Sequence, residues 1–187
     1  QWIASDLELM DYQKTLRALT DFGMEPEKEM WTLSKKIREM TVAVSNSTAV
    51  WLRKEFDAPK PIRRATVSVS GLGLFELYVN GQRISDHQLD PAFTDYQKRV
   101  FYLTHDVTAA LKTGRNAVGV VLGNGWFNLV IPHTLRYYAA DYIAPPQLRL
   151  DLDIEYTDGS HKIIGSDESW KFTTDGPIRF NSILSGE

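Results

Sequence analysis

The carboxylates are the residues of this chain whose chemistry is easiest to assess from the sequence. Glycoside hydrolysis requires two carboxylates on opposite sides of one sugar. Five candidates for such a pair are Glu76, Asp90, Asp95, Asp106 and Asp141. Asp106 has a structural explanation, because it precedes a short turn at 107–111 that it can cap. Glu76 stands between Phe75 and Leu77 in an apolar strand, where alternation would also place it on a solvent face. We therefore predict no catalytic residue in this chain.

Motifs for other kinds of chemistry are missing from the sequence. It contains no nucleophile elbow, no phosphate-binding glycine loop and no H-E-x-x-H zinc helix. The four histidines are widely spaced and form no ligand-like repeat: His87, His105, His133 and His161. There is no cysteine, which excludes a disulfide framework and a thiolate zinc site. We therefore expect no required cofactor.

Composition and length limit the partners and the domain count. The formal net charge of −3 gives no reason to expect nucleic acid or an anionic membrane as a partner. No apolar run approaches the ~20 residues of a membrane span, and no signal-peptide pattern opens the chain. At 187 residues we expect one domain with an appendage. Because the chain opens at Gln1 and stops at Glu187 just after a strand-like stretch, we expect a piece of a longer protein.

Two amphipathic helices are expected near the N-terminus. The Ser-Asp-Leu-Glu segment at 5–8 fits a capping box, and apolar residues then recur at helical spacing up to Gly23. A second helical stripe follows Pro26 and consists of Met30, Leu33, Ile37 and Met40. We predict a helical hairpin over residues 5–48 that packs on itself or on the following domain, with partner binding as the alternative.

From Val50 onward the hydrophobic period changes from helical to alternating. Segments 74–79 and 82–84 flank Asn80-Gly81, the dipeptide that most strongly indicates a two-residue hairpin turn. Between 147 and 156, apolar and charged residues alternate, so one face should be buried: Leu148, Leu150, Leu152, Ile154 and Tyr156. Further strands are predicted at 65–70, 116–122, 161–164, 170–173 and 178–180. Many short strands separated by turn residues predict an all-β sandwich.

Three features of the sequence resemble a known family. They are Thr94-Asp95-Tyr96 with Lys98-Arg99-Val100, the segment Leu122-Gly123-Asn124-Gly125-Trp126-Phe127, and the opening Trp2-Ile3. All three are similar to the bacterial α-L-rhamnosidase family. The Asn80-Gly81 hairpin and residues 106–118 are less specific, because similar segments occur in other galactose-binding-like domains. The resemblance covers residues 1–3 and about 49–187.

The resemblance implies a mainly β fold, a jelly-roll or galactose-binding-like β-sandwich. Residues 1–4 would supply the first strand segment and residues 49–187 the rest of the sandwich. The helical hairpin at 5–48 departs from the family's pattern and looks like an insertion. It would shield a sheet edge, contact the catalytic domain or mediate association.

The resemblance also implies a non-catalytic role. In that family hydrolysis belongs to a downstream (α/α)6 barrel with acidic residues as general acid and base. The chain would be an accessory domain that supports hydrolysis of terminal α-L-rhamnose from glycosides or polysaccharides. Its partners would be the barrel and neighbouring domains of the same parent chain, with no nucleic acid and no membrane. We expect the parent to be a bacterial periplasmic, secreted or cell-surface protein.

A carbohydrate-binding role is the alternative. In some family members the corresponding sandwich binds L-rhamnose through a calcium ion, which takes carboxylate, amide and carbonyl oxygens. The resemblance assigns Glu76 and Asn124 as calcium and sugar ligands, with Trp126 stacking on the sugar. The same residues have a structural interpretation, in which Asn124-Gly125 turns the chain and Trp126 fills the core. Clustering of Glu76 and Asn124 beside an exposed Trp126 would favour sugar binding.

Overall fold

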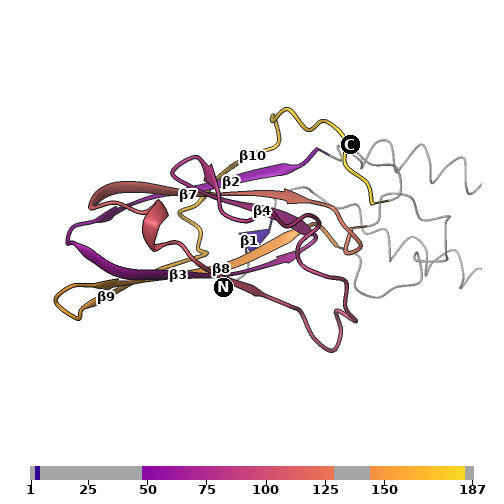
Figure 1. Cartoon of the computed structure of the whole chain (residues 1–187). Helices are drawn as coiled ribbons and strands as arrows, with labels where there is room; N and C mark the ends of the chain where they lie inside the picture. The colour runs from indigo at the N-terminus through magenta and orange to yellow at the C-terminus, as the bar shows by residue number, and fades with distance from the viewer. Residues whose placement is uncertain (1–2, 5–47, 129–143, 184–187) are drawn as a thin grey trace, which may run out of the picture.

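The computed structural model describes residues 3–4, 48–128 and 144–183, which form two antiparallel sheets lying face to face (Figure 1). Sheet A has the order β1 (Ile3–Ala4), β8 (Gln147–Tyr156), β3 (Ile62–Leu72) and β6 (Leu103–Asp106), and β9 (His161–Gly165) also pairs with β8. Sheet B has the order β10 (Lys171–Thr173), β2 (Val50–Ala58), β7 (Gly114–Gly123), β4 (Leu74–Val79) and β5 (Gln82–Arg83). The predicted mainly β sandwich is therefore confirmed.

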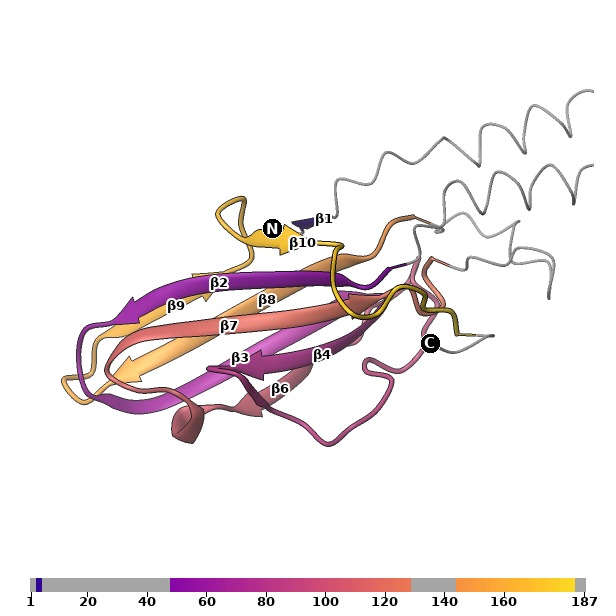
Figure 2. The same cartoon turned by 90° about the horizontal axis from the view of Figure 1, so that it is seen from above.

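The chain crosses repeatedly between the two layers (Figure 1), and seen from above the strands of the two sheets overlap (Figure 2). Consecutive long strands β2, β3 and β4 alternate between sheets B and A, and β6, β7 and β8 do the same. A short 3₁₀ helix, η1 (Thr108–Ala110), lies between β6 and β7. The helical hairpin predicted at 5–48 lies outside the described residues except for Thr48. In the part of the chain that is described, no helix is long and apolar enough to cross a membrane.

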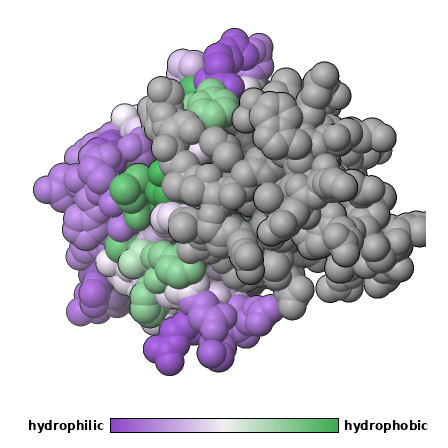
Figure 3. All heavy atoms as spheres, turned by 90° about the vertical axis from the view of Figure 1, so that its right-hand side faces the viewer, coloured by the Kyte–Doolittle hydropathy of each residue, from purple (hydrophilic) through white to green (hydrophobic). Residues whose placement is uncertain are grey.

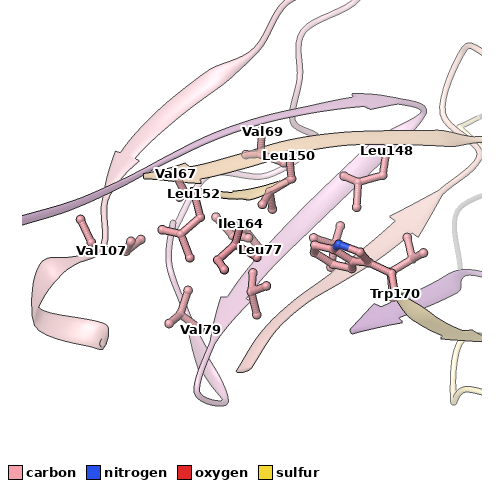
Figure 4. Close-up of a cluster of buried hydrophobic side chains, with 14 of the residues drawn as sticks. Val67, Val69, Leu77, Val79, Val107, Leu148, Leu150, Leu152, Ile164 and Trp170 are labelled. Atoms are coloured by element: carbon pink, nitrogen blue, oxygen red, sulfur yellow. The ribbon is translucent and has the colours of Figure 1, made fainter. Parts of the chain in front are cut away.

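The core lies between the sheets because the strands alternate apolar and polar residues. In β8 the side chains of Leu148, Leu150, Leu152 and Ile154 are fully buried, and Tyr156 is 3% exposed. This is the face that the sequence predicts to be buried. Figure 4 shows the leucines of β8 pointing toward the inner side chains of β4 on the opposite sheet. Burial of each such side chain stabilises the fold by roughly 1.5–3 kcal/mol.

Tight turns connect the strands where the sequence predicts them. Asn80 and Gly81 have φ values of 50° and 83°, which is the left-handed pair that a type I′ hairpin turn needs. The predicted cap is also present, since Asp106 Oδ1 accepts a hydrogen bond from the Thr108 N–H at 2.9 Å. Gly73 makes the crossing from β3 to β4 with a φ of 127°. A side chain there would also collide with the Gly123 carbonyl.

The strand predicted at 178–180 is not formed, so that prediction was wrong. The Ile178 carbonyl accepts a hydrogen bond from the N–H of Ala49, just before β2, at 3.3 Å, but residues 178–180 join no strand ladder. Phe180 is 40% exposed. The apolar alternation there is broken just upstream by Gly176-Pro177, and Pro177 has no N–H to donate to a strand ladder.

The inter-sheet core predicts a contrast between two residues of the β8–β9 hairpin. Leu152→Ala should lower the free energy of unfolding by about 2–5 kcal/mol, because it leaves a cavity in a fully buried site. Ile163→Ala is the matched control, since Ile163 is 67% exposed on the outer face and should change stability by less than about 0.5 kcal/mol. Urea denaturation of both variants measures this, and equal losses would contradict the assignment of the core.

Candidate functional site

Glu76 lies on the outer face of sheet B, because Phe75 and Leu77 on either side of it point into the core. Its Oε1 accepts a hydrogen bond from Arg83 Nη2 at 2.8 Å, and its Oε2 accepts one from the Tyr78 hydroxyl at 2.7 Å. The hydrogen bond to Glu76 raises the pKa of Tyr78, and burial adds to that shift. Both oxygens of this carboxylate therefore have protein partners.

Asn124 is buried where β7 ends, with 5% of its surface exposed. Its backbone N–H donates to Asn181 Oδ1 at 2.6 Å, and its side-chain amide donates to the Asn181 carbonyl at 3.0 Å. Its Oδ1 accepts a hydrogen bond from Asn128 Nδ2 at 2.9 Å. Asn124 thus ties the segment after β10 to the end of β7.

Trp126 belongs to a cluster of aromatic rings at the same end of the sandwich. Its ring centroid is 5.8 Å from that of Phe93, which is 5.7 Å from that of Tyr96. The Tyr96 centroid is in turn 5.3 Å from that of Phe127. These edge-to-face contacts join the connection at 84–102 to the turn after β7. We call Phe93, Tyr96, Trp126 and Phe127 the aromatic cluster.

Gly125 determines how Trp126 is presented. Its φ is 53°, and an added Cβ would approach Leu74 Cγ at 2.9 Å and the Gly73 carbonyl carbon at 3.0 Å. A side chain at this position would be strained in both respects. In the described structure, Asn124-Gly125 turns the chain and half-buried Trp126 packs on Phe93. Glu76 has different partners on the outer face of sheet B, so the contacts do not join the three predicted site residues into one set.

The other candidate carboxylates have local structural partners. Three of them pair with near neighbours in the sequence: Asp90 with His87, Asp95 with Lys98, and Asp106 with Thr108. Asp141 lies outside the described residues. Within the described ranges, no group of three or more His, Cys, Asp or Glu side chains is arranged to hold a metal ion. Calcium also takes amide and carbonyl oxygens, so calcium binding stays a prediction.

Sequence spacing missed one cluster, in which two histidines come together beside an aspartate. The rings of His87 and His105 are 6.4 Å apart, and His87 Nδ1 lies 3.3 Å from Asp90 Oδ2. His105 pairs in register with buried Val67, so its side chain faces the sandwich interior at the edge of sheet A. Burial lowers the pKa of His105, while the charge of Asp90 acts in the opposite direction. The alternation of Leu103, His105 and Val107 was the signal available in the sequence.

Apolar side chains are exposed along the connection that carries the aromatic cluster. Leu89 is 66% exposed, Phe93 49%, Phe101 44% and Tyr102 68%. We call these four residues the apolar surface. The view onto this end of the sandwich shows hydrophobic residues in several places among hydrophilic ones (Figure 3). Exposed apolar groups that gather in one region typically mark an interaction site.

The histidine environments predict opposite titration behaviour for His105 and His161. An NMR pH titration should place the pKa of His105 below the usual ~6.5 and that of His161 above it. Burial disfavours protonated His105, whereas Asp153 Oδ1 lies 2.9 Å from His161 Nδ1 and stabilises the protonated ring.

The shift at His105 also predicts a pH dependence of stability. Below about pH 6.5 the unfolded chain binds a proton at His105 more readily than the folded chain, so stability falls as the pH falls. His105→Gln should reduce that fall. A His105 pKa equal to or above that of His161 would contradict this account of the cluster.

Comparison with known proteins identifies relatives of the chain. Residues 60–187 match the family described as the α-L-rhamnosidase N-terminal domain. An α-L-rhamnosidase of Formosa agariphila is 37% identical over 154 residues, which cover 80% of this chain and 16% of that protein. An α-L-rhamnosidase of Streptomyces avermitilis is 38% identical over 151 residues, covering 78% of this chain and 14% of that protein. The chain thus spans roughly a sixth of the length of these relatives.

Solved structures agree with this relationship. The Streptomyces avermitilis α-L-rhamnosidase complexed with L-rhamnose superposes with a TM-score of 0.68 at 38% identity, over 75% of this chain and 13% of that chain. The α-L-rhamnosidase of Aspergillus terreus gives a TM-score of 0.64 at 35% identity, over 74% of this chain and 16% of that chain. The family match, the sequence identities and the shared fold lead to one conclusion: the chain belongs to the α-L-rhamnosidase N-terminal domain family.

Proposed function

We propose that this chain is a non-catalytic accessory domain of an α-L-rhamnosidase. It would support hydrolysis of terminal α-L-rhamnose by packing on the catalytic part of the same parent chain, an (α/α)6 barrel that supplies the acid and base. The relatives are α-L-rhamnosidases, and the chain spans roughly a sixth of their length. Within the described residues, each candidate carboxylate pairs with a nearby protein group, which supports a non-catalytic role. The parent is expected to be exported to the periplasm, medium or cell surface of a bacterium.

The packing role rests on the apolar surface, which shares Phe93 with the aromatic cluster. Tyr102 and Leu89 are 68% and 66% exposed, although each side chain would gain roughly 1.5–3 kcal/mol if it were fully buried. An occupant is available, because most of the length of the relatives lies outside the region that this chain matches. We therefore assign the neighbouring part of the parent chain as the partner of this surface.

Hydrogen bonds hold the backbone of this surface in place. The Ser70 hydroxyl donates to the Phe101 carbonyl at 2.6 Å, which fixes the chain just before β6. The Thr94 hydroxyl donates to the Arg99 carbonyl at 2.8 Å and closes the loop between them. A surface held in this way loses little conformational entropy when it docks, so its apolar contacts contribute more fully to association.

A calcium-dependent rhamnose-binding module within the same enzyme is the second candidate. It would require Glu76 and Asn124 to offer oxygens to a cation. Arg83 and Tyr78 donate to both oxygens of Glu76, and Asn128 donates to the amide oxygen of Asn124. Each of these oxygens already accepts a hydrogen bond from the protein, and the Arg83 guanidinium beside Glu76 would repel a cation, so these contacts favour the packing role.

The packing role predicts different effects in the isolated chain and in the parent enzyme. The double variant Phe101→Ser/Tyr102→Ser should change the unfolding free energy of the isolated chain by less than about 1 kcal/mol, because both side chains are exposed. In the full-length enzyme the same change should cost about 2–5 kcal/mol, because it removes two buried aromatic contacts. Denaturant unfolding of both proteins measures the difference.

The control for this comparison is Ile163→Ser, at a side chain of β9 that is 67% exposed and lies far along the sequence from the connection at 84–102. It should have little effect in either protein. A double variant that leaves the full-length enzyme as stable as the unmodified one would contradict the packing role.

Calorimetry separates the two candidates. L-rhamnose titrated into the chain should give the same heat in calcium and in EDTA, because Glu76 and Asn124 are engaged elsewhere. Glu76→Gln keeps the shape of the side chain and serves as the matched variant. Binding that appears only with calcium and disappears in Glu76→Gln would overturn the packing role in favour of the carbohydrate-binding module.

A further inference from the structure

Strand β6 is an edge of sheet A, with no strand on its outer side among the described residues. On its inner side it pairs with β3, from Val69 opposite Leu103 to Thr66 opposite Asp106. An edge strand presents a row of backbone N–H and C=O groups that can pair with another segment of chain. We call the outer side of β6 the open edge.

The hydrogen-bond pattern determines which backbone groups point to the open edge. The Val107 N–H donates to the Ala65 carbonyl at 2.9 Å, so these two residues form a hydrogen-bonded pair at the end of the β3–β6 ladder. Hydrogen-bonded and non-hydrogen-bonded pairs alternate along an antiparallel ladder. His105, two residues before Val107, therefore also points its N–H and C=O groups toward β3. The residues between them point theirs to the open edge: Thr104 and Asp106.

The open edge is accessible and lacks the features that usually protect an edge. Thr104 and Asp106 are exposed, and in the part of the chain that is described no backbone hydrogen bond reaches their outward groups. Natural edges are protected by lysine, proline, a bulge or a very short strand. β6 has neither lysine nor proline, and its register with β3 runs without a bulge. By contrast, β9 contains Lys162, and the end strands β10 and β5 of sheet B have three and two residues.

The open edge continues directly into the apolar surface. Phe101 and Tyr102 immediately precede β6 and are 44% and 68% exposed. The Ser70 hydroxyl donates to the Phe101 carbonyl at 2.6 Å, which keeps this part of the chain beside β3 as well. A segment that covers the two aromatic side chains would therefore lie next to the outward backbone groups of β6.

From these features we propose that the parent enzyme docks on this domain by strand addition. An extended segment of the neighbouring part of the parent chain would pair with the open edge and become the next strand of sheet A. Backbone hydrogen bonds give affinity in this mode of recognition, and alternate side chains give specificity. The proposal rests on the packing role and supplies its mode of contact.

The occupant follows from the length of the relatives and from the pattern of β6. Most of the length of the relatives lies outside the region that this chain matches, so a further segment is available. Thr104 and Asp106 lie on the outer face of sheet A, whereas Leu103 packs against the core. The added strand should therefore place polar residues beside Thr104 and Asp106 and an apolar residue beside Leu103.

Hydrogen exchange resolved to single amides tests strand addition in the isolated chain and in the full-length parent enzyme. In the isolated chain, the amides of Thr104 and Asp106 should exchange rapidly and that of His105 slowly. In the parent, Thr104 and Asp106 should exchange at least about tenfold more slowly, because each would be bonded to the added strand.

Thr104→Pro removes an outward N–H without removing a bond to β3, so the isolated chain should remain folded by circular dichroism. In the parent, this variant should return the Asp106 amide to the exchange rate of the isolated chain. Ile163→Pro is the matched control. Because the Ser166 N–H donates to the Leu150 carbonyl, the same alternation places the Ile163 N–H on the outer edge of β9. Ile163→Pro should leave Asp106 protected in the parent.

Three results would overturn strand addition. One is equal exchange of Thr104 and Asp106 in the isolated chain and the parent, which decides the question even if Thr104→Pro does not fold. Another is slow exchange of Asp106 in the parent that a folded Thr104→Pro variant leaves unchanged. The third is a dimer of the isolated chain that Thr104→Pro converts to monomer, because the open edge would then be an interface between copies.

These results are distinguishable from a failure of the packing role. Phe101→Ser/Tyr102→Ser changes side chains only, whereas Thr104→Pro changes a backbone group of β6. A full-length enzyme destabilised by the double serine variant but with unprotected Thr104 and Asp106 amides would retain the packing role without strand addition. A full-length enzyme that the double serine variant leaves fully stable would contradict the packing role itself.

Discussion

Burial of the inner faces of the two sheets against each other is the constraint on which the rest of the structure depends. Leu148, Leu150 and Leu152 of β8 are fully buried, and they meet β4 and β7 from the other sheet. Side chains of a β-strand alternate between two faces. When one face is buried in the core, only the other face, the ends of the strand and, in an edge strand, the open edge remain available for binding. Function in this domain must therefore reside on an outer face, at a sheet edge or in the connections. The apolar surface is of that kind, because its residues lie in the connection at 84–102.

The polar residues that the sequence analysis names as candidate ligands mainly hold neighbouring parts of the protein in position. Asn124 ties the segment around Asn181 to the end of β7, and Glu76 holds Tyr78 and Arg83 on sheet B. A buried or half-buried polar group without a hydrogen-bond partner destabilises the folded state. Hydrogen bonds to neighbouring protein groups therefore stabilise Asn124 and Glu76 in these positions. Apolar side chains such as Tyr102 are exposed in the isolated chain, and in the proposed packing role another part of the parent enzyme covers them.

The sequence predicted what depends on local pattern. Strict alternation placed β8 at residues 147–156 and identified its buried face, and Asn80-Gly81 located the hairpin turn. The register between strands that are distant in the sequence could not be predicted, and the pairing of Val67 with His105 is an example, because it turns the His105 side chain toward the sandwich interior. Contacts between residues far apart in the sequence could not be predicted either, such as the contact between the His87 and His105 rings. Ile178 and Phe180 alternate like a strand, yet Pro177 just before them interrupts the ladder.

Hydrogen–deuterium exchange would measure whether the apolar surface packs on the rest of an α-L-rhamnosidase. Amide exchange would be compared between the isolated chain and the full-length parent enzyme under the same conditions. Packing of this surface predicts slower exchange in the parent across 84–102, with unchanged exchange in the core strand β8, which is buried in either case. Equal exchange rates at 84–102 in the two proteins would contradict it.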